Sequence, residues 1–293
     1  MSSENREIAQ GVESSVLYIV ATPIGNLGDV TGRALDVLQA VNLIAAEDTR
    51  HTGVLLNHFG INTQLISLHE HNEARRCRSL VLRLKRGEAI ALVSDAGTPL
   101  INDPGYHLVR AVRSAGFSVR AVPGVSAITA ALSICGLSTN RFAFEGFLSN
   151  RAASRQSQLS KLVHEERTLV FFESPRRLLS TLNDMRNIFG EARQAAVVRE
   201  ISKRFEMVLT GSLRELESKV RDDKNIQRGE LVIVVDGGDR SHLQNLIDPL
   251  QLMIILAEYL PHRDASMLAA QITGGKKNDF YRLLLEHMEN SDS

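Results

Sequence analysis

Three polar loops in the first half of the chain carry the residue types that bind small molecules. They cover Thr22–Asp29, Glu47–Gly53 and Ser94–Gly105, and each follows a short apolar run that indicates a buried strand. The third loop is the richest, since its twelve residues include two Gly, two Pro and two Asp. Glycines let backbone amides approach a ligand, and prolines fix the shape of a loop. We therefore predict ligand binding here, with carboxylates that hold ribose hydroxyls or an amino group.

Several common kinds of site are excluded by their missing signatures. The chain has no GxGxxG, GxxxxGK[ST] or GxSxG motif, which argues against a dinucleotide-binding Rossmann domain, a nucleoside triphosphatase and a serine hydrolase. His69 and His71 resemble a metal-binding pair, but no third ligand follows at a diagnostic spacing, so we predict a polar loop and no metal. Cys77 and Cys135 form no CxxC pair, which excludes a zinc ribbon or disulfide framework and favours a reducing cytosol.

The composition indicates an ordinary globular protein. The 293 residues are 43% hydrophobic and 23% charged, with 34 Lys+Arg balancing 34 Asp+Glu. No apolar run approaches the ~20 residues of a membrane span, and the polar start does not resemble a signal peptide, so we expect a cytoplasmic protein without a membrane partner. The neutral total hides an uneven distribution. Residues 148–228 hold 16 basic and 11 acidic side chains, whereas residues 229–293 hold 5 and 10.

The elements that position these loops indicate an α/β protein with two domains and a helical end. Residues 1–15 are expected to be a flexible tail. Strands at 16–21, 43–46, 89–93 and 117–122 alternate with helices, which predicts a mostly parallel sheet in an N-terminal domain of residues 16–122. Pro123-Gly124 breaks this pattern.

The second half of the chain has a different pattern. Strands are expected at 142–145, 169–173, 195–199, 206–210 and 230–236, with helices between several of them. Adjacent strands without a helix between them indicate a mixed sheet, in a second α/β domain of residues 123–238. Three short helices at 250–260, 264–272 and 278–288 then form a small C-terminal domain of residues 248–293, vaguely like a helix-turn-helix.

An ordered set of motifs runs through residues 16–236. It consists of VATPIGNLGD (20–29), AEDTRHTG (46–53), SDAGTPLINDPG (94–105), PGVSAITAAL (123–132), FEGFL (144–148), FFESPRR (171–177), REISK (199–203) and RGELV (228–232). Each motif alone is weak, but together they resemble the tetrapyrrole-methylase superfamily and, more narrowly, its branch of small-subunit ribosomal RNA methyltransferases. That superfamily usually has Gly-Asp-Pro in the third loop. Here the loop has Gly97-Thr98-Pro99, with an acid at Asp95, which favours the RNA branch.

The resemblance implies a two-domain, tetrapyrrole-methylase-like enzyme that binds S-adenosyl-L-methionine in the cleft between its domains. It would methylate the ribose 2′-hydroxyl of a cytidine in the decoding region of 16S rRNA, in the small ribosomal subunit, as a homodimer. The alternatives are a precorrin-type tetrapyrrole C-methyltransferase and a non-catalytic ribosome-assembly factor that binds RNA. By motif position, the expected cofactor contacts are Pro23, Asp95, Ala96, Gly97, Thr98, Ser126, Ala127, Phe171 and Phe172.

Catalytic and RNA-binding residues are predicted by analogy and by charge. A ribose hydroxyl is a poor nucleophile at neutral pH, so a base or a cation near the developing alkoxide would help. The candidates lie at or just beyond strand ends: Glu47, Asp48, Arg50, Glu173 and Lys203. Each of these carboxylates could instead cap a helix or form a salt bridge. The RNA backbone needs cations, for which the candidates are Arg151, Arg155, Arg176 and Arg177.

Overall fold

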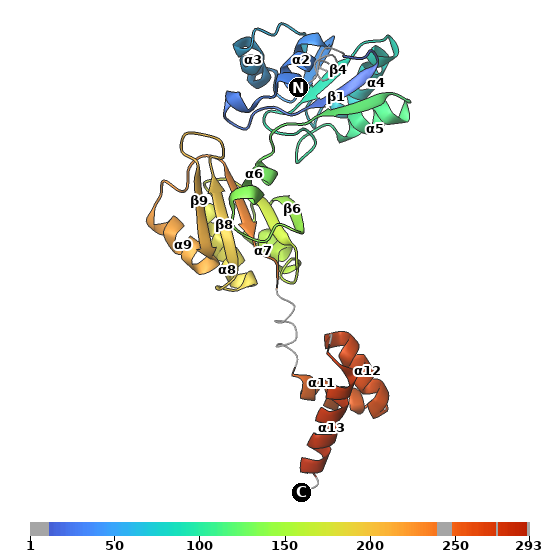
Figure 1. Ribbon diagram of the computed structural model, residues 1–293, viewed down its shortest axis with the longest axis vertical. Coiled ribbons are helices and arrows are strands. Elements are labelled where there is room, and N and C mark those ends of the chain that lie inside the picture. The colour runs from blue at the N-terminus through green and yellow to red at the C-terminus, as the bar shows by residue number, and fades with distance from the viewer. Residues whose placement is uncertain (1–11, 239–247, 274, 292–293) are drawn as a thin grey trace, which may run out of the picture.

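The computed structural model describes residues 12–238, 248–273 and 275–291. Those residues form two five-stranded sheets, each with its own helices, and a separate group of three C-terminal helices (Figure 1). This is the α/β architecture that the sequence predicts. We refer to the two sheets with their helices as the first unit and the second unit.

The first sheet is entirely parallel, with the strand order β3-β2-β4-β1-β5. Its strands are β1 (Val16–Val20), β2 (Leu43–Ala46), β3 (Leu65–Ser67), β4 (Ile90–Val93) and β5 (Ser118–Val122). The helices around it are α2 (Gly32–Ala40), α3 (Thr49–His58), α4 (Glu73–Lys85) and α5 (Tyr106–Ser114), with a short 3₁₀ helix η2 (Leu27–Asp29). Apolar residues of α2 and α3 pack on one face and those of α4 and α5 on the other. The central strands are therefore buried on both faces, as is typical of parallel sheets.

The sequence pattern missed the edge strand β3. This strand has only three residues, all of them half-buried, and the three residues before it are polar. Too few apolar positions remain to show an alternation of period two. Helix α2 is capped by Thr31, whose hydroxyl accepts a hydrogen bond from the backbone N–H of Ala34 at 3.1 Å.

The second sheet is mixed, with the order β6-β7-β10-β8-β9. Only β6 and β7 are parallel, and the other pairs are antiparallel. The strands are β6 (Phe142–Phe147), β7 (Thr168–Glu173), β8 (Gln194–Arg199), β9 (Met207–Ser212) and β10 (Leu231–Val235). Four helices belong to this unit: α6 (Ala127–Ile134), α7 (Ala152–Ser160), α8 (Leu178–Phe189) and α9 (Leu213–Asp222).

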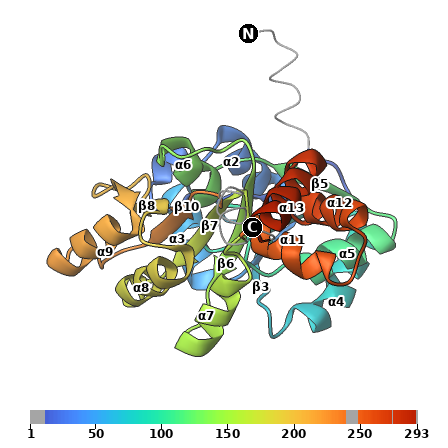
Figure 2. The same ribbon diagram turned by 90° about the horizontal axis from the view of Figure 1, so that it is seen from below.

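The two faces of the second sheet have different coverings. Helices α7, α8 and α9 lie side by side along one face, where they enclose the largest apolar core (Figure 2). Helix α6 covers the other face, together with Ile24 from the loop after β1. The first unit therefore contributes directly to the core of the second, on the side where the strand-end loops of the two units meet.

The C-terminal helices are α11 (Pro249–Ala257), α12 (His262–Thr273) and α13 (Lys277–Ser291). They pack against one another around a small core that includes Met253, Ala269 and Phe280. Within residues 248–273 and 275–291 the chain forms no strand, as the sequence predicts. No helix in the described ranges is long and apolar enough to cross a membrane.

Candidate active site

A cavity of about 360 Å³ lies where the loops of the two units meet, and we call it the central cavity. The first unit contributes residues from the loops after β1 and β4: Ile24, Ala96, Gly97, Thr98, Ile101 and Asp103. The second unit contributes Ser126, Ala127, Phe147, Phe172, Glu173, Ser174, Pro175, Ile201, Gly229, Glu230, Leu231 and Val232. The cavity thus lies at the carboxyl ends of parallel strands, where α/β proteins bind their ligands.

The loop after β4 is held in place by hydrogen bonds to neighbouring segments. Gly97 has a φ of 75°, and its N–H and C=O both bond with the backbone of Thr22 at 2.9 Å. Leu100 and Asn102 also adopt left-handed conformations, which non-glycine residues avoid unless the surroundings enforce them. The hydroxyl of Thr98 donates to the carbonyl of Val125 at 3.1 Å and ties the loop to the segment that leads into α6. The predicted ligand-binding loop is therefore a fixed wall of the cavity.

Six of the nine predicted cofactor contacts line the central cavity. They are Ala96, Gly97, Thr98, Ser126, Ala127 and Phe172. Pro23, Asp95 and Phe171 do not line it. Side chains alternate along a strand, so if Phe172 faces the cavity its neighbour must face the opposite side of the sheet. The Phe171 side chain is accordingly fully buried in the core beneath the sheet, and we correct the assignment of this side chain as a cofactor contact.

Four carboxylates cluster beside the cavity, from the loops after β2 and β4. The backbone N–H of Asp48 donates to Asp95 at 3.0 Å, and the N–H of Asp95 donates to Glu47 at 3.3 Å. Burial raises the pKa of Glu47, whereas Arg50 holds the pKa of Asp48 well below its usual range. Burial also raises the pKa of Asp103 to about 6, opposed by a hydrogen bond with Ser94 and assisted by the charges of Glu47 and Asp95.

The catalytic candidates of the first unit lie near the cavity but do not line it. Asp48 forms a bidentate pair with Arg50, with N–O distances of 2.6 and 3.1 Å, and the Arg50 side chain is 89% exposed. Asp48 also caps α3 by accepting from the backbone N–H of Arg50. Asp48 thus caps a helix and forms a salt bridge, which are the alternative roles that the sequence left open for it.

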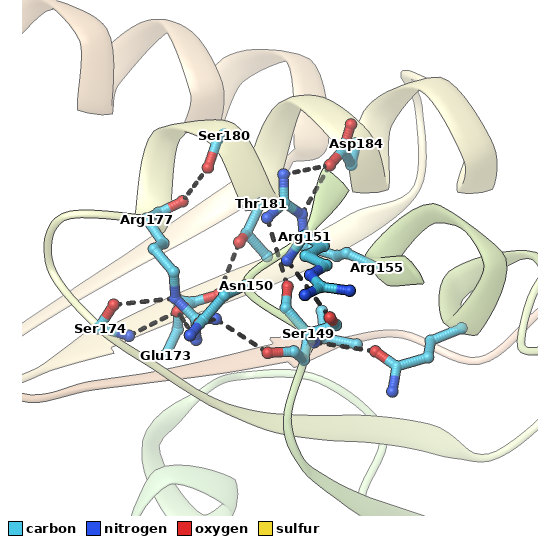
Figure 3. A network of polar contacts seen from close by, with 12 residues as sticks. Ser149, Asn150, Arg151, Arg155, Glu173, Ser174, Arg177, Ser180, Thr181 and Asp184 are labelled. Carbon is cyan, nitrogen blue, oxygen red and sulfur yellow. Dashed lines mark hydrogen bonds and ion pairs between the residues drawn. The ribbon is translucent and has the colours of Figure 1, made fainter. Parts of the chain in front are cut away.

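Glu173 lines the cavity, but both of its oxygens are occupied (Figure 3). One oxygen accepts from the backbone N–H of Ser174 at 2.6 Å and lies 2.5 Å from the Arg177 guanidinium. The other accepts from the Thr181 hydroxyl at 2.6 Å. Its side chain is fully buried. Three donors thus occupy this carboxylate, which suits it to anchoring β7 to α8.

Lys203 does not line the cavity, but it pairs with a residue that does. Its ammonium group lies 3.0 Å from Glu200 and 2.8 Å from the cavity residue Glu230. Partial burial opposes protonation, but hydrogen bonds with Glu230 and Glu200 raise the pKa of Lys203 above its usual value. The adjacent Ser202 hydroxyl donates to Asp29 of the first unit. Lys203 is therefore a permanent cation at the junction of the two units.

The four RNA-binding candidates lie in different environments. Arg151 and Arg176 are exposed, and Arg177 is half-buried beneath the loop after β6, where it bonds to the Leu148 carbonyl at 2.9 Å. Arg155 is buried and pairs with Asp184 at 2.6 Å, each side chain being 6% exposed (Figure 3). We therefore correct the assignment of Arg155: its guanidinium joins α7 to α8 and does not reach the surface.

Arg176 and Arg177 line a shallow groove next to the cavity, which we call the outer groove. It also includes Phe147, Leu148, Ser149, Asn150 and Ser174. Phe147 and Ser174 belong to both hollows, so the groove and the cavity share a wall. Phe147 is 50% exposed and packs against Phe172 with ring centres 5.6 Å apart.

Sequence reasoning did not single out several cavity residues. Asp103 stood within the loop that we predicted to bind a ligand, and its position after an apolar strand was the available signal. Ile201, Gly229 and Glu230 come from segments just outside β8 and β10. They lie within the REISK and RGELV motifs, but no role in the cavity was assigned to them. The pair His69 and His71 has ring centres 6.0 Å apart, and the described ranges contain no group of three or more His, Cys, Asp or Glu side chains placed to hold a metal ion.

Comparison with solved structures defines the class of this fold. A cobalt precorrin-4 methyltransferase superposes with a TM-score of 0.58 at 16% identity, covering 76% of this chain and 95% of that one. A uroporphyrin-III C-methyltransferase from Thermus thermophilus gives 0.54 at 21% identity, covering 76% and 94%. The family model for tetrapyrrole (corrin/porphyrin) methylases matches residues 16–217. The two sheets with a cavity between them are thus those of a tetrapyrrole methylase.

Sequence relatives place the chain more narrowly. A ribosomal RNA small subunit methyltransferase I from Escherichia coli O157:H7 is 50% identical, over 92% of this chain and 94% of its own. One from Pseudomonas aeruginosa is 48% identical, over 96% and 100%. The model of the RsmI C-terminal HTH domain matches residues 247–287, in agreement with the expected helix-turn-helix. The chain therefore belongs to the ribosomal RNA small subunit methyltransferase I family.

Proposed function

We propose that this protein transfers a methyl group from S-adenosyl-L-methionine to the small-subunit ribosomal RNA, at the ribose 2′-hydroxyl of a cytidine in the decoding region of 16S rRNA. The observation that carries the proposal is identity of 44–50% over nearly the whole chain to relatives named for methylating that RNA. The precorrin methylases share only the fold, at identities too low to carry a substrate. A non-catalytic role is disfavoured because the relatives are named as methyltransferases.

The central cavity fits the proposed cofactor. A volume of about 360 Å³ lies within the usual range for small-molecule sites. The wall of Ala96, Gly97 and Thr98 has small side chains that let a ligand lie close to the loop, and Phe172 presents an aromatic face to a base. When bound, the cofactor supplies a sulfonium methyl group that is already activated. The enzyme's contribution is then to align the acceptor oxygen, which can lower the barrier by roughly 7–11 kcal/mol.

The outer groove supports RNA as the substrate. Arg176, exposed in the groove, and Arg151, exposed on the loop beside it, form no ion pair within the described ranges, so their charges are available to phosphates. Phe147 lies between groove and cavity and offers a surface on which an unstacked base can rest. We propose that RNA runs along the groove and presents one ribose to the cavity. Arg177 supports the groove from below.

Three further expectations belong to the same proposal. The protein is expected to act as a homodimer, in the cytoplasm, on the small ribosomal subunit or its 16S rRNA. The C-terminal helices, which match a helix-turn-helix model, are expected to share in RNA binding. Size measurement by light scattering tests the dimer, with a mass of about twice 32.3 kDa as the expected result.

The test of the proposal is methyl transfer to defined acceptors. Small subunits and 16S rRNA from a strain without this gene are incubated with labelled S-adenosyl-L-methionine, with a tetrapyrrole as the parallel acceptor. We expect label in 16S rRNA alone, and nuclease mapping with mass spectrometry places it on a ribose. Label in the tetrapyrrole, or in neither acceptor, contradicts the proposal.

A further inference from the structure

Three carboxylates line the central cavity, and two of them are already paired with cations. Glu173 is held by Arg177, Thr181 and the Ser174 backbone. Glu230 is 73% exposed and pairs with Lys203. Both oxygens of Glu173 are thus committed, and Glu230 faces solvent beside a fixed cation. Neither is suited to accept a proton during a reaction.

Asp103, the third carboxylate, differs in burial and in partners. It is half-buried in the cavity wall, and no Lys, Arg or His of the described ranges forms an ion pair with it. Asn102 before it has a φ of 67°, and the loop that carries it is fixed by the Thr22–Gly97 bridge. Its carboxylate is therefore positioned by the backbone, with acceptor capacity left for a ligand.

The charged groups around Asp103 come from every element that borders it. Asp95 on its own loop and Glu47 from the loop after β2 are both anionic neighbours, and Ser94 supplies a hydrogen bond. Across the cavity are the two paired carboxylates, Glu173 and Glu230. Burial, with the charges of Glu47 and Asp95, raises the pKa of Asp103 to about 6. The group is ionised at neutral pH but accepts a proton more readily than an ordinary aspartate.

We propose that Asp103 is the general base that accepts the proton of the ribose hydroxyl during methyl transfer, an inference that rests on the proposed function. The hydroxyl oxygen forms a bond to the methyl carbon as the bond from that carbon to the sulfonium sulfur breaks. The electron pair of the broken bond stays on sulfur, which becomes a neutral thioether. The proton passes to the carboxylate of Asp103 and from there to solvent, which restores the base.

The test compares Asp103→Asn and Asp103→Glu with the unaltered enzyme, and with Asp36→Asn as a control at an exposed position on α2. Methyl transfer to unmodified small subunits is measured between pH 5 and pH 9 under single-turnover conditions. Cofactor affinity is measured separately by calorimetry. We expect Asp103→Asn to lower the rate by about 10²- to 10⁴-fold without a change in cofactor affinity.

The pH profile supplies a second readout. In the unaltered enzyme, the logarithm of the rate is expected to rise with unit slope below a pH of about 6 and then to level off. This rise should be absent in Asp103→Asn. Asp103→Glu keeps a carboxylate in the cavity wall, so it should recover part of the rate and retain a pH-dependent rise.

Each outcome separates the inference from the proposed function. If the unaltered enzyme methylates neither small subunits nor 16S rRNA, the proposed function fails, whatever the variants do. If the unaltered enzyme is active and Asp103→Asn retains its rate or its pH-dependent rise, Asp103 is not the base. Loss of cofactor binding in a folded Asp103→Asn would make the residue a cofactor ligand and overturn the inference. Should Asp103→Asn fail to fold, Asp103→Glu decides the question. A folded Glu variant that binds cofactor and keeps a lowered rate with a pH-dependent rise supports the inference, and a Glu variant without any pH-dependent rise overturns it.

Discussion

The buried pair of Arg155 and Asp184 leads to a prediction that separates structural arginines from RNA-binding ones. The Nε and Nη2 atoms of Arg155 both lie 2.6 Å from one Asp184 oxygen, and Gln156 donates to the other at 2.8 Å. Both charged side chains are 6% exposed. Arg155→Ala leaves the aspartate as a buried anion with one neutral donor. Breaking such a pair typically costs about 3–5 kcal/mol of the free energy of unfolding.

The assay is guanidinium denaturation followed by circular dichroism, because the chain has no tryptophan for fluorescence. Arg151→Ala is the matched control: it removes an exposed arginine one turn earlier and should change the free energy of unfolding by less than about 0.5 kcal/mol. Arg155→Met combined with Asp184→Leu removes both charges and should recover most of the lost stability. The reasoning is refuted if Arg155→Ala keeps normal stability but weakens RNA binding, since Arg155 would then face the substrate.

Four further predictions follow from individual contacts. Arg151→Ala and Arg176→Ala should each lower the slope of RNA affinity against salt by about 0.7–0.9, as measured by filter binding at several salt concentrations; an unchanged slope places the RNA elsewhere. Ser212→Ala removes the capping box of α9 and should lower the free energy of unfolding by about 0.5–2 kcal/mol in denaturation experiments. Burial raises the pKa of the Cys77 thiol, so Cys77 should react with iodoacetamide more slowly than a free cysteine at pH 8 until denaturant is added. The raised pKa of Asp103 means that the folded state favours its protonated form. The contribution of this side chain to the free energy of unfolding is present below its unfolded pKa of 3.8 and is lost as the pH rises through about 6. Asp103→Asn should therefore raise the free energy of unfolding at pH 8 by about 1 kcal/mol, a figure discounted for the partial exposure of the group. At pH 4 the same substitution should leave the free energy of unfolding unchanged.

The stabilisation by Asp103→Asn also bears on the active site. A half-buried, ionised carboxylate without a cation partner lowers the free energy of unfolding. Proteins commonly keep such destabilising groups where their function requires them. An equal melting temperature for Asp103→Asn and the unaltered protein at pH 8 would show that burial does not penalise this charge.

Much of the fold was predictable because its signals are local. Strands such as β1, β4 and β10 are short, β-branched and almost entirely buried, and the loops between them hold the expected glycines and prolines. The short edge strand β3 was missed because three half-buried residues carry no periodic signal. Turns and strands depend on residues that are close in the sequence. How the two sheets come together depends on residues that are far apart in it.

The candidate site was predictable only in part, for the same reason. The motif positions identified six cavity residues, including Gly97 and Ser126, because those loops keep their local character. They could not distinguish Phe171 from Phe172, since that depends on which face of the sheet each side chain takes. The burial of Arg155 depends on Asp184, 29 residues later in the sequence. Asp103 became a candidate only once the carboxylates Glu173 and Glu230 were found to be paired.

The central claim is that this protein methylates a ribose of the small-subunit ribosomal RNA. The most direct measurement is transfer of labelled methyl groups from S-adenosyl-L-methionine to small subunits that lack the modification, followed by mass spectrometry of the digested 16S rRNA. The account predicts one modified nucleoside, a cytidine that carries the methyl group on its 2′-oxygen. Label on a base, label on a tetrapyrrole acceptor, or no label in any acceptor would contradict it.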